Sequence, residues 1–239
     1  MRARRQCPGG FVYHVLNRAN SKRMIFENAL DFMAFEHVLA EGVLQYPIRL
    51  LGYCIMSNHW HLLLWPYHDG ELSVFMKWIT MTHSHRWNAA HGETGFGHLY
   101  QGRFKSFPVQ SNGHFLSVLR YIESNPLRAG LVSRSMFWRW SSLAIRQGIR
   151  KDGLSLADAP VSLPDHWLDL VDLHPNEGDL KKIERSIGRG CPLGDDAWTV
   201  QTASQMELTA SLHALGRPKG RKKVSDTIFK KPINDNEIR

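Results

Sequence analysis

The sequence has 239 residues, of which 43% are hydrophobic, which suffices for one domain of moderate size or a larger domain with an appendage. No stretch approaches the roughly 18 consecutive apolar residues of a transmembrane helix, and the basic N-terminus is not followed by the apolar segment of a signal peptide. Cys7, Cys54 and Cys191 are too few and too widely spaced for a disulfide framework or a zinc ribbon. These features predict a cytoplasmic protein with reduced cysteines and no membrane segment.

Charge is distributed unevenly along the chain, whose net charge is +8. Residues 1–147 contain 16 Lys and Arg against 8 Asp and Glu (+8), residues 148–215 contain 6 against 11 (−5), and residues 216–239 contain 8 against 3 (+5). We therefore expect a main domain, a connector with a helical segment, and a basic, disordered tail. Two basic regions favour a polyanionic partner, above all nucleic acid, although a solvated basic surface would have the same composition.

Hydrophobic periodicity predicts the order strand, helix, strand, strand, helix, strand, helix within residues 11–125. Tyr46-Pro47 ends the first helix, and Ser57-Asn58 is a two-residue turn that joins the second and third strands into a hairpin. The predicted strands span residues 11–16, 48–56, 59–65 and 103–109, and the predicted helices span residues 28–43, 71–89 and 113–125. Beyond them, residues 148–180 predict a partly irregular connector and residues 195–215 one further helix.

The third predicted strand contains His59-Trp60-His61. Side chains alternate between the two faces of a strand, so both imidazoles project from one face, which Leu63 and Trp65 continue. Two imidazoles on one rigid face are half of a metal site. Two satisfied histidines beside a core strand would have the same pattern, and the pair alone does not decide between these alternatives.

A second histidine pair, His83 and His85, lies in the helix predicted over residues 71–89. Side chains two apart on a helix point about 200° away from each other, so these histidines cannot share a metal ion. We expect His83 to pack in the core and His85 to face away from it.

The helix predicted over residues 113–125 places Tyr121 and Asn125 about 40° apart on one flank of its apolar stripe. Glu123 lies far round the helix from them and is a poor candidate for the same site. Pro126 disfavours helical geometry at Asn125 and places that residue at the helix end. By itself, Tyr121 would be interpreted as a half-buried tyrosine at a helix edge.

Basic and aromatic residues alternate from Arg103 to Phe107, after a glycine-rich loop at residues 91–102 that lacks the lysine of a Walker nucleotide site. This alternation suits phosphate contact combined with base stacking, and equally suits a half-buried edge strand. The aromatic cluster at residues 136–142 is expected to pack against the core.

The basic tail begins with residues 216–223, which resemble the core of an AT-hook, an extended arm that enters a minor groove. Arg217, Lys219 and Arg221 would then contact DNA. A disordered basic tail would need no such role.

Taken together, His59-Trp60-His61 and the Tyr121-x-x-x-Asn125 helix resemble the HUH single-tyrosine transposases, specifically their REP-associated branch. The similarity covers about residues 10–145 in the same order. The flanking segments that resemble the branch are Tyr13-His14-Val15 with Asn17-Arg18, Gly52-Tyr53 through Asn58-His59, Gly102-Arg103-Phe104-Lys105-Ser106, and Asn125-Pro126-Leu127-Arg128-Ala129-Gly130-Leu131-Val132.

The resemblance implies an α+β fold, a ferredoxin-like antiparallel sheet with packed helices, over residues 1–147, followed by a C-terminal extension. It implies His59, His61 and the Asn125 amide oxygen as ligands of Mg²⁺ or Mn²⁺, and Tyr121 as the nucleophile. Ligand softness alone would favour Mn²⁺ or Zn²⁺ over Mg²⁺. The predicted DNA contacts are Arg18, Arg103, Lys105 and Arg128, together with the three tail residues.

The expected function is a metal-dependent endonuclease and strand transferase that acts on single-stranded or hairpin DNA, with repeated extragenic palindromes as substrate and a 5′-phosphotyrosine intermediate. We expect such a protein at the nucleoid. Two alternatives stay open: a non-catalytic DNA-binding protein that retains the fold, and an unrelated metallohydrolase that acts without Tyr121. The sequence does not determine the oligomeric state.

Overall fold

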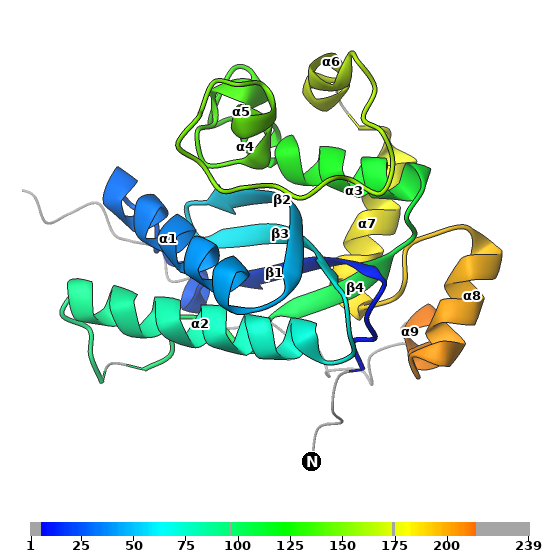
Figure 1. Ribbon diagram of the computed structural model, residues 1–239, viewed down its shortest axis with the longest axis horizontal. Coiled ribbons are helices and arrows are strands. Elements are labelled where there is room, and N and C mark those ends of the chain that lie inside the picture. The colour runs from blue at the N-terminus through cyan, green and yellow to red at the C-terminus, as the bar shows by residue number, and fades with distance from the viewer. Residues whose placement is uncertain (1–5, 96, 174, 214–239) are drawn as a thin grey trace, which may run out of the picture.

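The computed structural model describes residues 6–95, 97–173 and 175–213. Its first part alternates strands and helices in the predicted order (Figure 1). The elements are β1 (Val12–Arg18), α1 (Ala29–Gln45), β2 (Ile48–Met56), β3 (His59–Pro66), α2 (Glu71–Ala90), β4 (Lys105–Val109) and α3 (Gly113–Glu123). Further along lie the short helices α4 (Asn125–Arg128), α5 (Ser142–Arg146) and α6 (Trp167–Asp172), then α7 (Glu177–Arg189), α8 (Asp196–Gln205) and α9 (Thr209–Leu212).

The four strands form one sheet in the order β2-β3-β1-β4, with every neighbouring pair antiparallel. A β-α-β-β-α-β chain arranged in this strand order is the ferredoxin-like fold, so the predicted fold class is confirmed. Ser57 and Asn58 form the turn of the β2–β3 hairpin, in which Met56 lies opposite His59.

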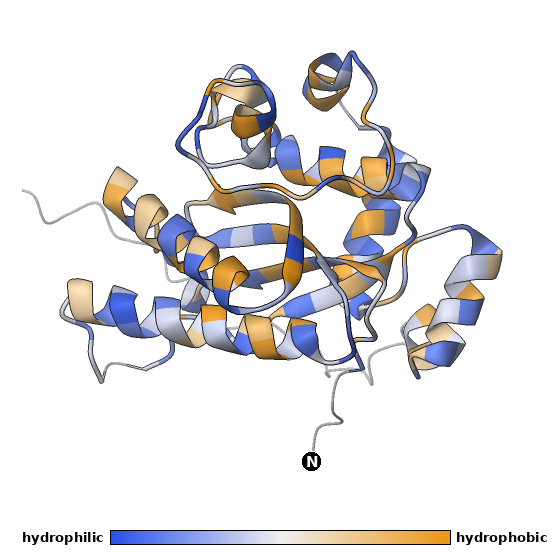
Figure 2. Cartoon of the chain, viewed as in Figure 1, coloured by the Kyte–Doolittle hydropathy of each residue, from blue (hydrophilic) through white to orange (hydrophobic). Residues whose placement is uncertain are grey.

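Helices cover both faces of the sheet (Figure 1). On one face α1 and α2 enclose an aromatic core that includes Tyr53, Trp60, Phe35 and Phe75. On the other face α3, α6 and α7 pack over a second core. Figure 2 shows hydrophobic and hydrophilic residues side by side on the turns of α2 and α3, as amphipathic helices require.

A β-bulge interrupts the pairing of β2 with β3 between Leu50 and Gly52. Leu50 opposite Leu64 belongs to the aromatic core, whereas Leu51 and the next pair, Gly52 opposite Leu63, lie on the α3 face. A Cβ atom at Gly52 would lie 2.5 Å from a methyl group of Leu119 on α3, so glycine allows that helix to approach the sheet closely.

The predicted helix over residues 113–125 is divided in the structure. The helix α3 ends at Glu123, and Asn125 begins the separate four-residue helix α4, which has Pro126 in its first turn. Proline has no N–H to donate and fits the first turn of a helix, where that donor is not needed. Asn125 therefore lies at a helix start, where we predicted the end of a longer helix.

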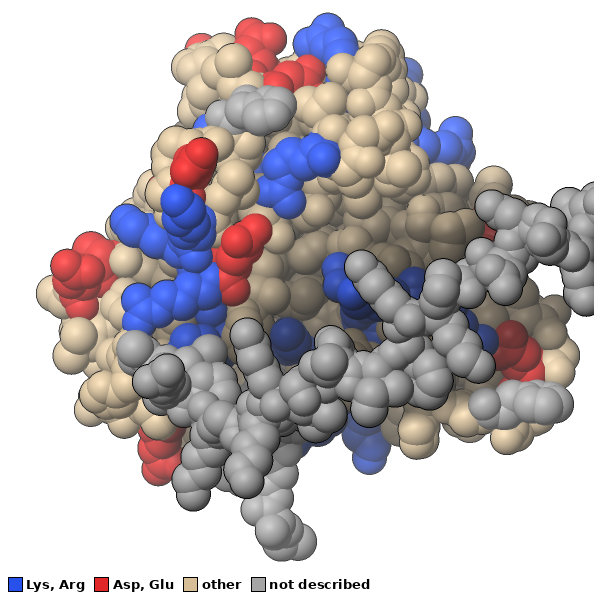
Figure 3. All heavy atoms as spheres, turned by 180° about the vertical axis from the view of Figure 1, so that it is seen from behind, with Lys and Arg blue, Asp and Glu red and all other residues tan. Residues whose placement is uncertain are grey.

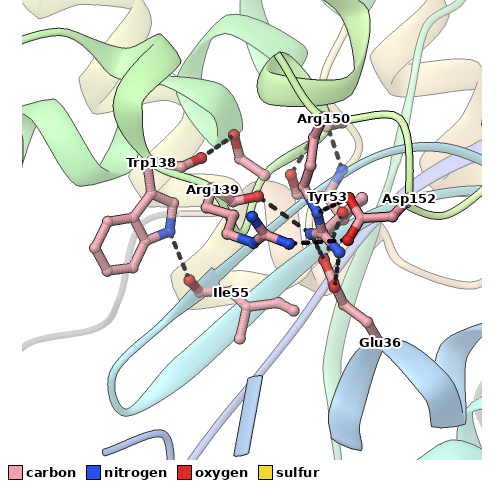
Figure 4. A network of polar contacts seen from close by, with 9 residues as sticks. Glu36, Tyr53, Ile55, Trp138, Arg139, Arg150 and Asp152 are labelled. Atoms are coloured by element: carbon pink, nitrogen blue, oxygen red, sulfur yellow. Dashed lines mark hydrogen bonds and ion pairs between the residues drawn. The ribbon is translucent and has the colours of Figure 1, made fainter. Parts of the chain in front are cut away.

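The segment after α4 packs against the sheet through Met136, Trp138 and Trp140, as expected for the aromatic cluster at residues 136–142, whereas Phe137 in that cluster is exposed. The Trp138 indole donates to the carbonyl of Ile55, and a buried ion pair joins Arg150 to Glu36 on α1 at 2.6 Å (Figure 4). Glu36 also accepts a hydrogen bond from Tyr53 on β2. This network ties residues 138–152 to α1 and β2.

The C-terminal part is more helical than predicted. The connector contains α6 and α7, and the single helix expected over residues 195–215 is two helices, α8 and α9. The three cysteines are buried, and none of them is joined to another described cysteine by a disulfide bond, as expected. Among the described residues, no helix is long and apolar enough to cross a membrane.

Candidate active site

The strand register gathers polar residues on the α3 face of the sheet. His61 lies opposite Leu16 of β1, and His59 lies opposite Arg18. Cross-strand partners point to the same face, so His59, His61 and Arg18 share it, and His14 belongs to it through the alternation of β1. The prediction that His59 and His61 project together is confirmed: their ring centroids lie 5.0 Å apart.

The turn residue Asn58 orients His59. Its amide nitrogen donates to the carbonyl of Lys22, and its amide oxygen lies 2.7 Å from His59 Nδ1. Because that oxygen only accepts, His59 carries its proton on Nδ1 and keeps the lone pair of Nε2 free. Burial, and then the nearby charge of Arg18, lower the pKa of His59 to about 4, so the ring is neutral and able to bind a metal ion.

His61 has a second histidine as its partner. His61 Nδ1 lies 2.9 Å from His14 Nε2, and the two rings stack with centroids 5.0 Å apart. Burial, followed by the neighbouring histidines and the charges of Arg128 and Arg18, holds the pKa of His61 well below its ordinary value. His61 Nε2 makes no hydrogen bond to a described residue and is not among the enclosed unpartnered atoms, so it reaches the surface of the site.

Tyr121 lies directly over these histidines. Its ring is nearly perpendicular to that of His61 at 5.9 Å between centroids, and it lies 6.1 Å from that of His14. The ring is 8% exposed, and within the described residues its hydroxyl makes no hydrogen bond. The structure thus brings together Tyr121 and His61, two residues separated by 60 positions in the sequence.

Arg128 links Tyr121 to Asn125. Its guanidinium lies 4.1 Å from the centroid of the Tyr121 ring, and Nη2 donates to the Asn125 amide oxygen at 3.3 Å. The Asn125 amide nitrogen donates to the carbonyl of Tyr121. Arg128 Nη1 is buried without a hydrogen-bond partner, so the guanidinium places an uncompensated N–H beside Tyr121.

The donor set fits a divalent metal ion. His59 has a free lone pair on Nε2, and on the same sheet face His61 Nε2 makes no hydrogen bond to a described residue. Asn125 can add its amide oxygen if Arg128 releases it. In the described part of the chain, no three His, Cys, Asp or Glu side chains form a metal-binding group. An amide or solvent ligand must therefore complete any ion held by His59 and His61.

Next to the histidines lies a basic cavity of about 350 Å³. Arg18, Arg103 and Lys105 line it, together with Asn17 and Phe104. Figure 3 shows Lys and Arg side chains in the hollowed part of the face opposite to that of Figure 1. The predicted DNA contacts of the main domain therefore cluster beside the site, whereas Arg217, Lys219 and Arg221 lie outside the described residues.

The strand predicted over residues 103–109 begins at Lys105, so Arg103 precedes it, and base stacking by this segment is only partly compatible with the structure. Phe107 is 1% exposed and packs against His14, so it cannot stack on a base. Phe104 is half-buried and packs against the aromatic core. The exposed basic side chains, in contrast, remain free to meet phosphates.

Residues excluded from the site by sequence reasoning do lie elsewhere. His83 is buried on the α1–α2 face, and His85 is exposed. The Glu123 carboxylate is fully buried and accepts hydrogen bonds from Ser142, Arg146 and Trp167, which gives it a structural role.

Sequence reasoning missed His14 as a site residue. It lies four positions before Arg18 in the same strand, and this even spacing places both on one face. That signal was available, but it became specific only with the pairing of β1 and β3.

Comparison with known proteins supports a transposase family. Residues 9–125 match the family model described as "Transposase IS200 like". Two solved structures are similar: a REP-associated tyrosine transposase bound to a REP hairpin (17% identity, TM-score 0.49, 66% of this chain and 92% of that chain) and a proposed transposase from Deinococcus radiodurans R1 (15% identity, TM-score 0.38, 65% and 100%). No curated protein matches the sequence. Over residues 9–125, the chain belongs to the IS200-like transposase family.

Proposed function

We propose that this transposase cleaves and rejoins single-stranded or hairpin DNA in a metal-dependent reaction, with Tyr121 as the nucleophile. The observation that supports the proposal most strongly is the packing of the Tyr121 ring against His61, at 5.9 Å between centroids. A tyrosine whose hydroxyl makes no hydrogen bond to a described residue, and whose ring packs against a histidine that shares a sheet face with His59, suits such a reaction.

In the proposed reaction the Tyr121 oxygen attacks a backbone phosphorus and forms a phosphotyrosine with the 5′ end of the strand downstream of the break. The bond from phosphorus to the 3′ oxygen breaks, the phenol loses its proton, and the departing oxygen takes up a proton to become a 3′-OH. Attack of a 3′-OH on the phosphotyrosine reverses these changes and joins two strands. One tyrosine per site means one cleavage at a time.

The metal ion, held by His59, His61 and Asn125, would neutralise phosphate charge and align the reacting oxygens. Ligands of this kind accept Mg²⁺ or Mn²⁺, as the family resemblance implies. Arg128 adds a fixed positive charge next to the Tyr121 ring, at the place where the phosphate must arrive.

The proposed substrate is a DNA hairpin with an adjoining single strand, of the kind formed by repeated extragenic palindromes. Arg18, Arg103 and Lys105 line the basic cavity beside His59 and would hold the backbone of the strand. The choice of palindromic repeats rests on the sequence resemblance to the REP-associated branch.

Covalent trapping tests the proposal. The full-length protein is incubated with Mn²⁺ and a 3′-labelled single-stranded hairpin, and a denaturing gel detects label that stays on the protein. We expect a labelled adduct with the wild type and none with Tyr121→Phe, which loses only the hydroxyl. Tyr67→Phe, an exposed tyrosine at the end of β3, is the control. An adduct on Tyr121→Phe at the wild-type level refutes the nucleophile assignment, and Mn²⁺-dependent cleavage without any adduct favours a metallohydrolase.

A further inference from the structure

The buried His14 has no role in the reaction proposed above. It is fully enclosed between the sheet and α3, stacked on His61 and in edge contact with Phe107. Its Nε2 lies 2.9 Å from His61 Nδ1, and its Nδ1 is buried without a partner. A buried polar atom without a hydrogen bond destabilises the fold, so the position of this histidine requires an explanation.

His14 Nε2 and His61 Nδ1 lie 2.9 Å apart, so one proton lies between these two nitrogens and either ring can carry it. In one arrangement His61 Nδ1–H donates to His14 Nε2, and His61 Nε2 has a free lone pair. In the other, His14 Nε2–H donates to His61 Nδ1, so the neutral His61 carries its proton on Nε2. Only the first arrangement lets His61 bind a metal ion through Nε2.

The charges around the pair favour the first arrangement. The Arg128 guanidinium packs on the Tyr121 ring, which itself lies against His61, and Arg18 lies opposite His59 on the same sheet face. The Nδ1 edge of His61 is occupied by His14. Cations are attracted to a lone pair on the remaining edge and repelled by an N–H there. His59 adopts the same Nδ1–H form through Asn58, so both imidazoles would offer Nε2 to one ion.

We propose that His14 is a positioning residue that holds His61 in the Nδ1–H tautomer and so directs the His61 Nε2 lone pair into the metal site. Histidines that bind metals commonly donate their other ring N–H to a carboxylate, a carbonyl or water. Here a neutral imidazole takes that place. A carboxylate would bring a buried negative charge into the core beneath Tyr121, whereas a neutral ring accepts the hydrogen bond without one.

This inference rests on the proposed metal-dependent function, but its test includes a measurement of the His61 tautomer in the metal-free protein. Long-range ¹H–¹⁵N NMR of protein with ¹⁵N-labelled histidine identifies the tautomer of each ring, and the His14→Gln and His61→Gln variants assign the signals. In the metal-free wild type we expect His61 to carry its proton on Nδ1. A His61 ring protonated on Nε2 would overturn the inference.

Metal affinity gives the second measurement, by calorimetric titration of the full chain with Mn²⁺. His14→Leu removes the acceptor and should weaken binding by roughly 10- to 100-fold, as loss of a partner behind a metal ligand typically does. His14→Gln places a carbonyl oxygen near the former Nε2 and should recover most of that loss. His83→Leu removes another enclosed histidine with an unpartnered ring nitrogen and should leave Mn²⁺ affinity unchanged.

The outcomes separate the two proposals. Wild-type protein that binds no Mn²⁺ refutes the metal-dependent function, and the tautomer of His61 then decides the role of His14 alone. Tight Mn²⁺ binding that His14→Leu leaves at the wild-type level refutes the role of His14 and leaves the metal site standing. If His14→Leu does not fold, the wild-type spectrum and the affinity of His14→Gln still decide.

Discussion

Two buried histidines lie on opposite faces of the same sheet, and by several measures they are alike. Burial lowers the pKa of both His14 and His83 to about 3, and each has one ring nitrogen buried without a partner. Each is hydrogen-bonded through its other nitrogen, His14 to His61 and His83 to the hydroxyl of Tyr100.

The difference lies in where the hydrogen bonds lead. From His83 they continue through Tyr100 to the Trp60 indole, inside the aromatic core. From His14 they lead to His61, whose Nε2 reaches the site beneath Tyr121. A perturbed pKa and an unpartnered atom therefore do not by themselves identify a functional histidine. A path from the buried ring to an accessible lone pair does.

The sharpest test of this contrast is to replace one histidine on each face. His61→Ala removes a proposed metal ligand and should abolish metal-dependent DNA cleavage. His83→Ala removes core packing and should leave cleavage intact at temperatures where the variant is folded. Cleavage rates and the Mn²⁺ dependence of both variants provide the comparison, and loss of cleavage in folded His83→Ala would break it.

Substitutions on the α1–α2 side of the sheet should change the free energy of unfolding. Glu36→Ala removes the buried carboxylate that accepts from both Nη atoms of Arg150, which keeps only the exposed Asp152 as a charged partner, and should cost about 3–5 kcal/mol of unfolding free energy. Glu41→Ala, which breaks the exposed pair with Arg86, should cost less than about 1 kcal/mol. Urea unfolding of both variants measures the difference, and equal costs would contradict the structural role of the buried pair.

The pH dependence of the unfolding free energy should reveal the lowered pKa of His83 in the folded protein. Its folded-state pKa of about 3 is below the ordinary 6.5, so between these values the unfolded chain binds a proton that the folded protein does not. Stability therefore falls as the pH drops through this window, by about 1.4 kcal/mol per pH unit for one such group. His83→Leu should flatten the slope by that amount in urea unfolding across the window. An unchanged slope would show that His83 is not kept neutral by the fold.

The smallest expected effects concern single phosphate contacts on the site face. Arg103→Ala and Lys105→Ala should each reduce the slope of log K against log salt for hairpin binding by roughly 0.7–0.9. Arg86→Ala, on α2 at the opposite face, is the matched control and should leave the slope unchanged. If all three variants keep the wild-type slope, the basic cavity does not contact the DNA backbone.

Local signals in the sequence were sufficient for the elements that hold the site. The strand β2 matches its predicted bounds because Pro47 precedes it and Ser57-Asn58 follows it. Alternation alone placed His59 and His61 on one face, and helical periodicity placed Tyr121 away from Glu123. These properties depend on residues that are close together in the chain.

What could not be predicted depends on contacts between distant segments. The pair of His14 with His61 needs the register of β1 against β3, which alternation does not fix. The break at Ser124 was hidden because Pro126 fits both a helix end and the first turn of a new helix. The helix α7 had its own signals, an Asn176 cap and Gly190 at its end, which the composition of the connector concealed.

The bulge between Leu50 and Gly52 has a consequence for how the chain tolerates insertions and deletions. Along a strand, even-numbered residues face one side of the sheet and odd-numbered residues the other. In β2 the bulge exchanges these sides: Leu50 faces the aromatic core before it, and Tyr53 faces that core after it. One residue gained or lost there falls where the ladder is already irregular. One residue gained or lost between His59 and His61, in contrast, would turn the two imidazoles to opposite faces of β3, because successive side chains alternate between faces. The single residue between the two histidines is thus as strict a requirement of the site as their identity.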